Sequence, residues 1–166
     1  MATLTAVGAF LRLPLPYVPV TLQVPFVGLA GLWLGPWQGA ASQLVYLAAG
    51  LMGFPVFARG GGPQYVFEPS FGYLAGFAPG ALVTGFLARG SAGYLRTLLA
   101  VYAGLVAVYG AGLAHLFLVL GRAAEAPVAP EAILQAGLAP LPKDLALGLV
   151  TAYLSRHLHR AGARPT

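Results

Sequence analysis

Cysteine is absent from the 166-residue sequence, which excludes disulfide bonds and thiolate metal sites. Charge is scarce as well: 8% of the residues are charged, against about 25% in soluble domains. Acidic residues are the rarest, with four against nine lysines and arginines. A soluble fold of this size would not cover its surface with so few charges. The 58% hydrophobic content therefore predicts a membrane protein.

Four long stretches contain no charged residue. They lie between Arg12 and Arg59, Glu68 and Arg89, Arg96 and Arg122, and Asp144 and Arg156. A spanning helix needs roughly 20 apolar residues, so the first stretch has room for two spans. Each of the others, the last with its flanks, has room for one. Strands of a membrane barrel would alternate in polarity over about 10 residues, whereas these runs are continuously apolar and favour a helical bundle.

We predict an all-α integral membrane protein, a six-transmembrane-helix bundle forming one domain over residues 1–166. The expected helices cover residues 2–13, 22–34, 37–53, 70–88, 95–120 and 143–160. The first is short for a span, because about 12 residues rise only ~18 Å against a hydrocarbon core of ~30 Å. The start of the sequence lacks the pattern of a cleaved signal peptide, and none is expected.

Basic residues predict the orientation, because they concentrate in cytoplasmic loops. With six spans, the side that holds both termini receives five arginines and no acid: Arg89, Arg96, Arg156, Arg160 and Arg164. The other side receives four basic residues and all four acids: Arg12, Arg59, Arg122, Lys143, Glu68, Glu125, Glu131 and Asp144. The net charges are +5 and zero, so we expect both termini in the cytoplasm of a multi-pass cell-membrane protein. This imbalance also accounts for the overall charge of +5, and no nucleic-acid partner is expected.

Glycines four residues apart form two series, Gly31, Gly35 and Gly39, then Gly72, Gly76 and Gly80. Small residues at this interval let helix backbones approach closely in lipid. Pro36 should break the first series into a tight turn. The second series lies within one expected helix, and plain helix contact is the favoured role for it.

Motifs of catalysis are missing from the sequence. There is no GxxxxGK[ST] phosphate loop, no HExxH and no GxSxG, so we expect neither an enzyme nor a bound cofactor or metal. His157 and His159 stand in a basic tail without a carboxylate, where contact with solvent or lipid headgroups is favoured over metal binding. His115 is alone in its helix, and buried polar packing is favoured over ligand contact.

Polar residues of the predicted outer side indicate a pocket near the extracytoplasmic face. The first outer loop, 12–25, is stiffened by four prolines and contains Gln23. The second carries Arg59, Gln64 and Glu68, followed by Tyr73. Irregular backbone is tolerated at membrane depth where it lines a cavity, so this loop is expected to fold inward.

Two further polar positions lie in or next to expected helices. Gln43 and Tyr46 are one turn apart in the third helix. The third outer loop, 122–143, delivers Asp144 to the first turn of the last helix, where a carboxylate also interacts favourably with the helix N-terminus. Asp144 is therefore either a site residue or a simple capping residue.

One long stretch resembles a known family. The segments "LPLPYVPVTLQVPFVGLAGLWLGPWQGAASQLVYLAAGLMGFPVFARGGG" and "EPSFGYLAGF" resemble the BioY family, the biotin-specific substrate-binding components of energy-coupling-factor transporters. The similarity is close from Leu13 to Phe77 and returns at "LPKDLALGLV". It implies six helices, a vitamin pocket near the outer face, and lids formed by the first and third outer loops.

The sequence departs from the family pattern at two places. The family carries a lysine three residues after the aspartate of the last helix, and here that position is Leu147, with Lys143 the only lysine nearby. The threonine–glycine of a family GPTGGY element is Ser70–Phe71. The short first helix keeps Ala2 and Ala6, an AxxxA spacing like the one such components present to the coupling subunit.

The chemistry of biotin fits the polar residues. Asp144 would accept from a ureido N–H, with Gln43 or Gln23 completing the hydrogen bonds, and Arg59 would pair with the tail carboxylate. Aromatic residues would line the apolar part: Tyr46, Phe57 and Tyr73.

The resemblance implies a biotin-binding subunit that relies on partners for energy. These partners are a membrane-embedded coupling subunit and two ATPase subunits that use ATP. A component for a different small vitamin is the first alternative. An intramembrane enzyme acting on lipid would need a nucleophile–base pair or several deep carboxylates. An assembly protein without a ligand leaves Gln43, Arg59 and Asp144 unexplained.

Overall fold

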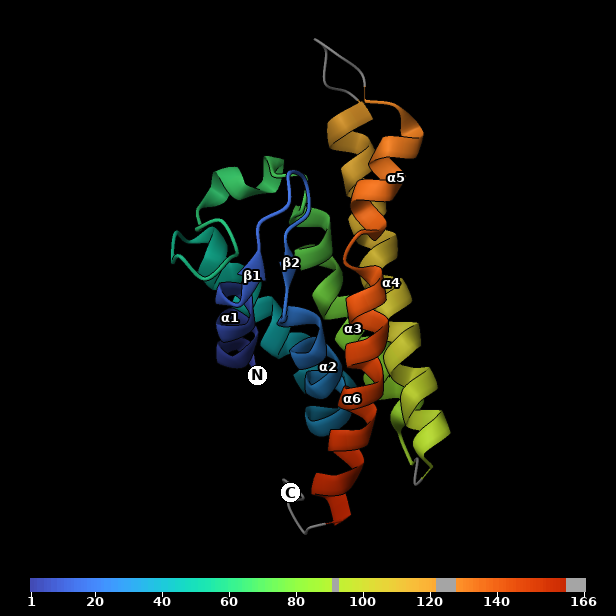
Figure 1. Ribbon diagram of the computed structural model, residues 1–166. Helices are drawn as coiled ribbons and strands as arrows, with labels where there is room; N and C mark the ends of the chain where they lie inside the picture. Colours follow the sequence, from blue (N-terminus) through green and yellow to red (C-terminus); the bar gives the residue numbers. More distant parts are fainter. Residues whose placement is uncertain (91–92, 122–127, 161–166) are drawn as a thin grey trace.

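The computed structural model is predominantly helical and describes residues 1–90, 93–121 and 128–160, with side chains to His157 (Figure 1). The elements are α1 (Ala2–Phe10), β1 (Arg12–Leu13), β2 (Val20–Thr21), α2 (Gln23–Leu51), the 3₁₀ helix η1 (Pro63–Phe67), α3 (Phe71–Ala88), α4 (Tyr94–Gly121), α5 (Pro130–Leu138) and α6 (Leu141–Arg160). Several residues named in the sequence analysis lie outside the described chain or side chains: Arg122, Glu125, Arg164, His159 and Arg160.

The first helix ends earlier than predicted. We expected it to reach residue 13, but α1 stops at Phe10 and the chain turns into a short antiparallel hairpin. Arg12 pairs with Thr21 and Leu13 with Val20. Three prolines separate the strands, and the residue before a proline avoids the helical conformation, so the helix cannot continue through Leu13. The hairpin stands between α1 and the start of α2 (Figure 1).

The predicted break near Pro36 lies inside α2. Gly35 adopts φ 79° and ψ 178°, a left-handed φ that favours glycine, and it interrupts the helical conformation. The two arms, 23–34 and 36–51, fold back on each other, because a Cβ on Gly39 would lie 2.7 Å from the carbonyl oxygen of Ala30. Along a straight helix these two residues would be about 13 Å apart. The expected helices 22–34 and 37–53 are these two arms.

The second glycine series joins α3 to α4, as predicted. A Cβ on Gly72 would lie 2.6 Å from the Ala111 carbonyl oxygen, and one on Gly76 2.9 Å from the Cα of Val108. Gly80 faces the same helix, with the side chain of Val108 2.6 Å from its Cβ position. The two helices are therefore in close contact over about two turns.

A helix within the third outer loop was not predicted. We expected residues 122–143 to be a loop, but α5 covers Pro130–Leu138 and α6 begins at Leu141 rather than residue 143. Pro130 opens α5 and Glu131 stands in its first turn, both favourable at a helix start. Gly137 packs against Leu113 of α4, so α5 lies along the upper part of that helix (Figure 1).

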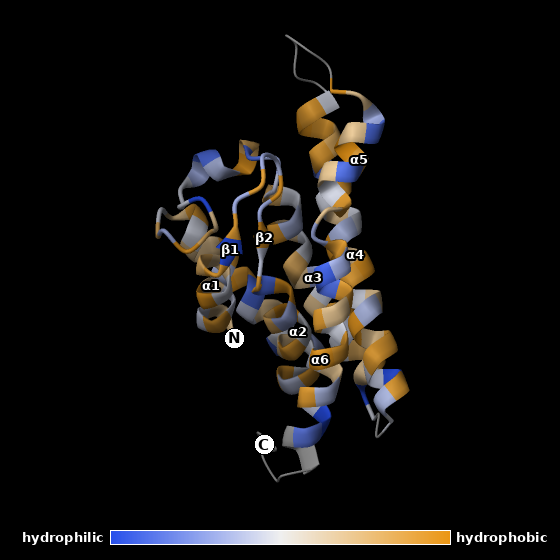
Figure 2. Ribbon diagram, viewed as in Figure 1, coloured by the Kyte–Doolittle hydropathy of each residue, from blue (hydrophilic) through white to orange (hydrophobic). Residues whose placement is uncertain are grey.

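Three helical stretches of the described chain are long and apolar enough to cross a membrane: Phe71–Ala88, Tyr94–Gly121 and Pro130–His157. Many large apolar side chains on their surfaces are exposed, as expected where lipid replaces water. Figure 2 shows hydrophobic residues along α4 and α6 and hydrophilic residues gathered at the C-terminal end of α6. The helical membrane-protein class predicted from composition is thus confirmed. The two arms of α2 are shorter than these three stretches.

Candidate functional site

A cavity of about 40 Å³ lies where the hairpin, η1, α3, α4 and the start of α6 meet. Its wall is mostly apolar, with Leu74 and Phe77 from α3 and Val18 from the hairpin loop. Pockets that hold drug-sized ligands are about 300–1,000 Å³. Rim side chains must therefore move to admit a molecule of that size.

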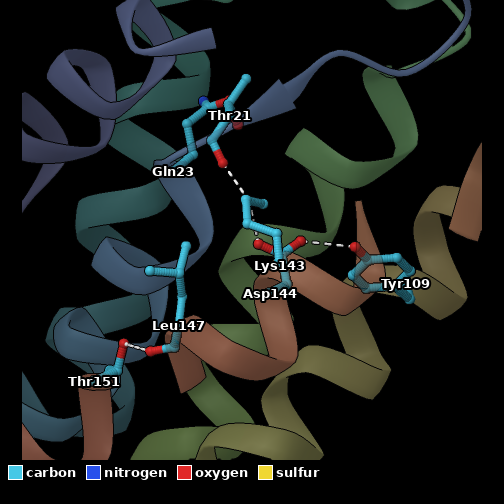
Figure 3. Close-up of polar contacts among 7 residues, drawn as sticks. All are labelled: Thr21, Gln23, Tyr109, Lys143, Asp144, Leu147 and Thr151. Atoms are coloured by element: carbon cyan, nitrogen blue, oxygen red, sulfur yellow. Dashed lines mark hydrogen bonds and ion pairs between the residues drawn. The ribbon is translucent and has the colours of Figure 1, made fainter. Parts of the chain in front are cut away.

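One side of the cavity is a buried group of polar side chains (Figure 3). The carboxylate of Asp144 is 3% exposed. Its Oδ2 accepts a hydrogen bond of 2.7 Å from the Tyr109 hydroxyl, and its Oδ1 accepts one from the Lys143 ammonium. Lys143 also donates to the backbone carbonyl of Thr21. Both carboxylate oxygens thus face side chains of the cavity, and the lysine joins α6 to the hairpin.

The facing side of the cavity is formed by Gln23 at the first position of α2. Thr21 Oγ1 donates to Gln23 Oε1 at 2.9 Å, and Gln23 Nε2 donates to the Tyr46 hydroxyl at 2.6 Å. Tyr46 in turn donates to the carbonyl of Val56 at 3.1 Å. An amide carries two N–H donors and two acceptor lone pairs, and these contacts use one of each. The contacts fix the orientation of the amide and leave hydrogen-bonding capacity toward the cavity.

Three of the six predicted site residues line the cavity: Gln23, Tyr73 and Asp144. Tyr73 donates its hydroxyl to the carbonyl of Gly137 at 2.7 Å and so ties α3 to α5. The ring of Tyr73 meets Tyr109 edge-on, with centroids 5.4 Å apart. The cavity therefore brings together residues from α2, α3, α4 and α6.

The other three predicted residues lie outside this lining. Gln43 is buried where α1 meets α2 and accepts from Thr5 Oγ1 at 3.2 Å. Tyr46 stands behind Gln23, edge-on to Phe57 with centroids 5.4 Å apart. Arg59 lies on the exposed rim and has protein partners of its own.

Arg59 links two loops of the rim. Its guanidinium contacts Glu68 at 3.2 Å and donates to the carbonyls of Leu15 and Pro16 at 2.8 and 2.7 Å. The 52–70 segment is thereby held against the loop of the hairpin. Arg59 thus joins these two loops without lining the cavity itself.

Lys143 and Tyr109 belong to the site but were not selected from the sequence. The adjacency of Lys143 to Asp144 was the available signal for the lysine, whereas a tyrosine within an apolar run carries none. Leu147 lies one turn further along α6, where its carbonyl accepts from Thr151 at 2.8 Å (Figure 3). Tyr65 of η1 also lines the cavity, and burial raises the pKa of its phenol above the usual value.

The remaining candidates have structural contacts. His115 Nε2 lies 3.2 Å from the carbonyl of Glu68, and its ring meets Phe71 edge-on. Ala2 and Ala6 are half-buried against the core of the bundle. Within the described part of the chain, no group of three histidine or acidic side chains is placed to hold a metal.

The comparisons with known proteins agree on one family. A sequence model of the BioY family matches residues 1–164. The chain is 49% identical over 121 residues to a probable biotin transporter BioY of Lysinibacillus sphaericus, covering 72% of this chain and 62% of that protein. It is 34% identical over 164 residues to the biotin transporter BioY of Rhodobacter capsulatus, covering 93% and 86%. The match to the first relative thus spans less than two thirds of its length.

The fold has a close counterpart among solved structures. The S-component for biotin from an ECF-type ABC transporter superposes with a TM-score of 0.82 at 24% identity, covering 96% of this chain and 86% of that chain. The chain therefore shares its overall fold with that structure. Together with the family match over residues 1–164, this shows that the chain belongs to the BioY family.

Proposed function

We propose that this chain binds biotin within the membrane and serves as the S component of an ECF-type transporter. The observation that carries the proposal is the buried Asp144–Lys143–Tyr109 group, which faces Gln23 across an otherwise apolar cavity. Biotin transporters among its relatives make this ligand the first candidate.

The cavity offers each group that biotin requires. A ureido ring has two N–H donors and one carbonyl acceptor. Asp144 would accept from an N–H, and the Lys143 ammonium or the free N–H of Gln23 would donate to the carbonyl. Leu74 and Phe77 would cover the bicycle. Because Lys143 already balances Asp144, the site suits a neutral ring better than a cationic vitamin.

Arg59 is the proposed partner of the tail carboxylate. Its guanidinium carries five N–H donors and already lies at the rim, where a tail leaving the cavity would pass. Binding in this way requires it to exchange the contact with Glu68, which is partly exposed and therefore weak. Gln43 and Tyr46 would act indirectly, by fixing the helices behind the cavity.

The wider assembly follows from the same proposal. The chain would form six membrane spans, counting α1 and the two arms of α2, with both termini in the cytoplasm. The +5 to zero distribution of charge supports this orientation. Without a phosphate-binding loop, the chain would depend on a coupling subunit and two ATPase subunits for energy. Ala2 and Ala6 would contribute to the contact with the coupling subunit.

Calorimetric titration of the full chain in detergent tests the ligand. Biotin should bind in a one-to-one complex without ATP, and a cationic vitamin such as thiamine should not. Asp144→Asn should weaken biotin binding about 10- to 150-fold, the effect of losing one charge-assisted hydrogen bond. Glu131→Gln, at an exposed acid of α5, is the matched control and should bind as the wild type does.

The capping alternative for Asp144 predicts a different result. Asparagine caps a helix start about as well as aspartate, so affinity would be unchanged in Asp144→Asn. That result would remove Asp144 from the site. Binding of another vitamin in place of biotin would overturn the ligand assignment itself.

Orientation is tested separately with single cysteines, since the chain has none of its own. Gln64→Cys should react with an impermeant thiol reagent from outside sealed cells. Ser91→Cys, at a position outside the described residues, should react only after the cells are opened. Labelling of both positions from outside would contradict the six-span arrangement.

A further inference from the structure

A second hollow lies far from the cavity, at the end of the molecule that carries the start of α4 and the end of α6 (Figure 1). Its volume is about 260 Å³, larger than that of the cavity under the hairpin. Four residues line it: Tyr94, Tyr153, Arg156 and His157. None of them has a part in the proposed substrate site.

Arg156 is the distinctive residue of this hollow. Its Nε is buried and has no hydrogen-bond partner among the described residues. The neighbouring Ser155 is engaged differently, since it accepts from the Trp33 indole at 3.2 Å. Buried donors in folded proteins are almost always paired. Arg156 is therefore a side chain beside the hollow with a donor that no described residue uses.

That partner should be negatively charged. The segments that form this end, 71–121 and 145–160, contain no acidic residue. Two further arginines of this end have contacts within the protein: Arg89 lies 5.2 Å above the Phe86 ring, and Arg96 donates to the carbonyl of Leu87 at 3.2 Å. Arg156 thus has positive charge and an unpaired donor beside helical segments that contain no acidic side chain.

The surroundings of the hollow are apolar as well as cationic. Tyr94 and Tyr153 supply rings with polar tips, as is common where a protein meets lipid headgroups. Leu95 of α4 and Leu149 of α6, next to these residues, are exposed. A ligand with an anionic head and an apolar chain would satisfy both parts of this surface.

We propose that the hollow between α4 and α6 binds the phosphate group of an anionic phospholipid, with Arg156 as its principal contact. Basic pockets between transmembrane helices are known to hold such headgroups. Arg156 supplies a fork of donors matched to phosphate oxygens. His157 and the Tyr153 hydroxyl would add further donors, while the Tyr94 hydroxyl donates to the carbonyl of Leu149 at 3.4 Å. The bound lipid would fasten the end of α6 to the start of α4.

Native mass spectrometry of the full chain in detergent tests this. Phosphatidylglycerol should remain bound, whereas phosphatidylcholine of the same chain length should be lost. Arg156→Gln should bind phosphatidylglycerol about 10-fold more weakly, as expected for one charge-assisted contact. Arg89→Gln, which removes the same charge from the same end, is the matched control and should leave binding unchanged.

Two further measurements separate the sources of phosphate and protect against misfolding. Inorganic phosphate should not raise the melting temperature, and a rise equal to that with short-chain phosphatidylglycerol would overturn the lipid assignment. Arg156→Lys keeps the charge without the fork and should bind between the wild type and Arg156→Gln, with unchanged helix content by circular dichroism. Equal retention of both lipids, or equal binding by Arg156→Gln and the wild type, would also refute the proposal.

Discussion

The contact between α3 and α4 differs in kind from the rim of the cavity. In the helix pair, the backbones themselves touch at Gly72, Gly76 and Gly80. At the rim, the hairpin is held by two long side chains, Lys143 from α6 and Arg59 from the 52–70 segment, which donate to its carbonyls. Close packing allows a single arrangement, whereas single polar contacts at partly exposed side chains are weak. The same chain thus combines a closely packed helix pair with a rim held by a few separate polar contacts.

Gly76→Val should have the largest effect on stability, because it disrupts the contact between α3 and α4. The new Cβ would lie 2.9 Å from the Cα and the carbonyl oxygen of Val108, so α3 and α4 would have to separate. We expect a loss of about 3 kcal/mol, at the upper end of overpacking effects. Thermal unfolding in detergent, followed by circular dichroism, measures it.

Gly110→Val is the control for this prediction. Gly110 is also in α4, and nothing lies within 4 Å of its Cβ position. The same substitution should therefore change stability by less than about 1 kcal/mol and should not destabilise the helix, because glycine has a lower helix propensity than valine. Equal losses at both positions would show that the glycine contacts do not hold the pair.

Lys143→Gln removes the ammonium that contacts both Asp144 and the carbonyl of Thr21 in the hairpin. Asp144 would lose its cation while staying buried, which we expect to cost about 1–3 kcal/mol, less than for a fully buried pair because a quarter of the lysine side chain is exposed. Denaturant unfolding measures the loss. The double variant Lys143→Gln/Asp144→Asn should recover part of it, and purely additive losses would show that the two side chains are not coupled.

Arg59→Gln should have the smallest effect on stability, about 1 kcal/mol or less, because a third of the arginine side chain is exposed. The substitution should instead increase the local mobility of the hairpin loop. Hydrogen exchange of residues 15–19 should become faster, since Leu15 and Pro16 lose the contacts that hold their loop. Arg12→Gln, at an exposed arginine of β1, is the control. Equal acceleration in both variants would argue against a specific tie.

The difference between the helix pair and the rim also explains which elements could be predicted from the sequence. The helices expected at 70–88 and 95–120 are α3 and α4 within one residue at each end, because uninterrupted apolar runs ended by Arg89 and Arg96 leave little choice. The hairpin was missed because two-residue strands have no periodicity. The helix α5 was missed because its nine residues are too few for a membrane span and lie between Pro130 and Pro140.

The site was predictable only where polarity contrasted with its surroundings. Gln23, Arg59 and Asp144 were selected as polar residues of the predicted outer side, and Gln43 as an amide within an apolar helix. The structure places Gln23 and Asp144 at the cavity, whereas Gln43 and Arg59 have protein partners that are distant in sequence. Thr5 lies 38 residues from Gln43, and Leu15 lies 44 residues from Arg59. Such pairings depend on the folded chain and cannot be predicted from the hydropathy of the sequence.

Gly35 also sets how deep a ligand would lie. With the reversal at Gly35 near one membrane boundary, the arm 23–34 rises only about 18 Å, so Gln23 stops roughly 12 Å short of the opposite boundary of a 30 Å core. The cavity would then lie below the membrane surface. Its depth would be set by the length of the arm 23–34, and the hairpin would form part of its wall. Lengthening this arm by one helical turn would lift the floor by about 5 Å without altering a single lining residue.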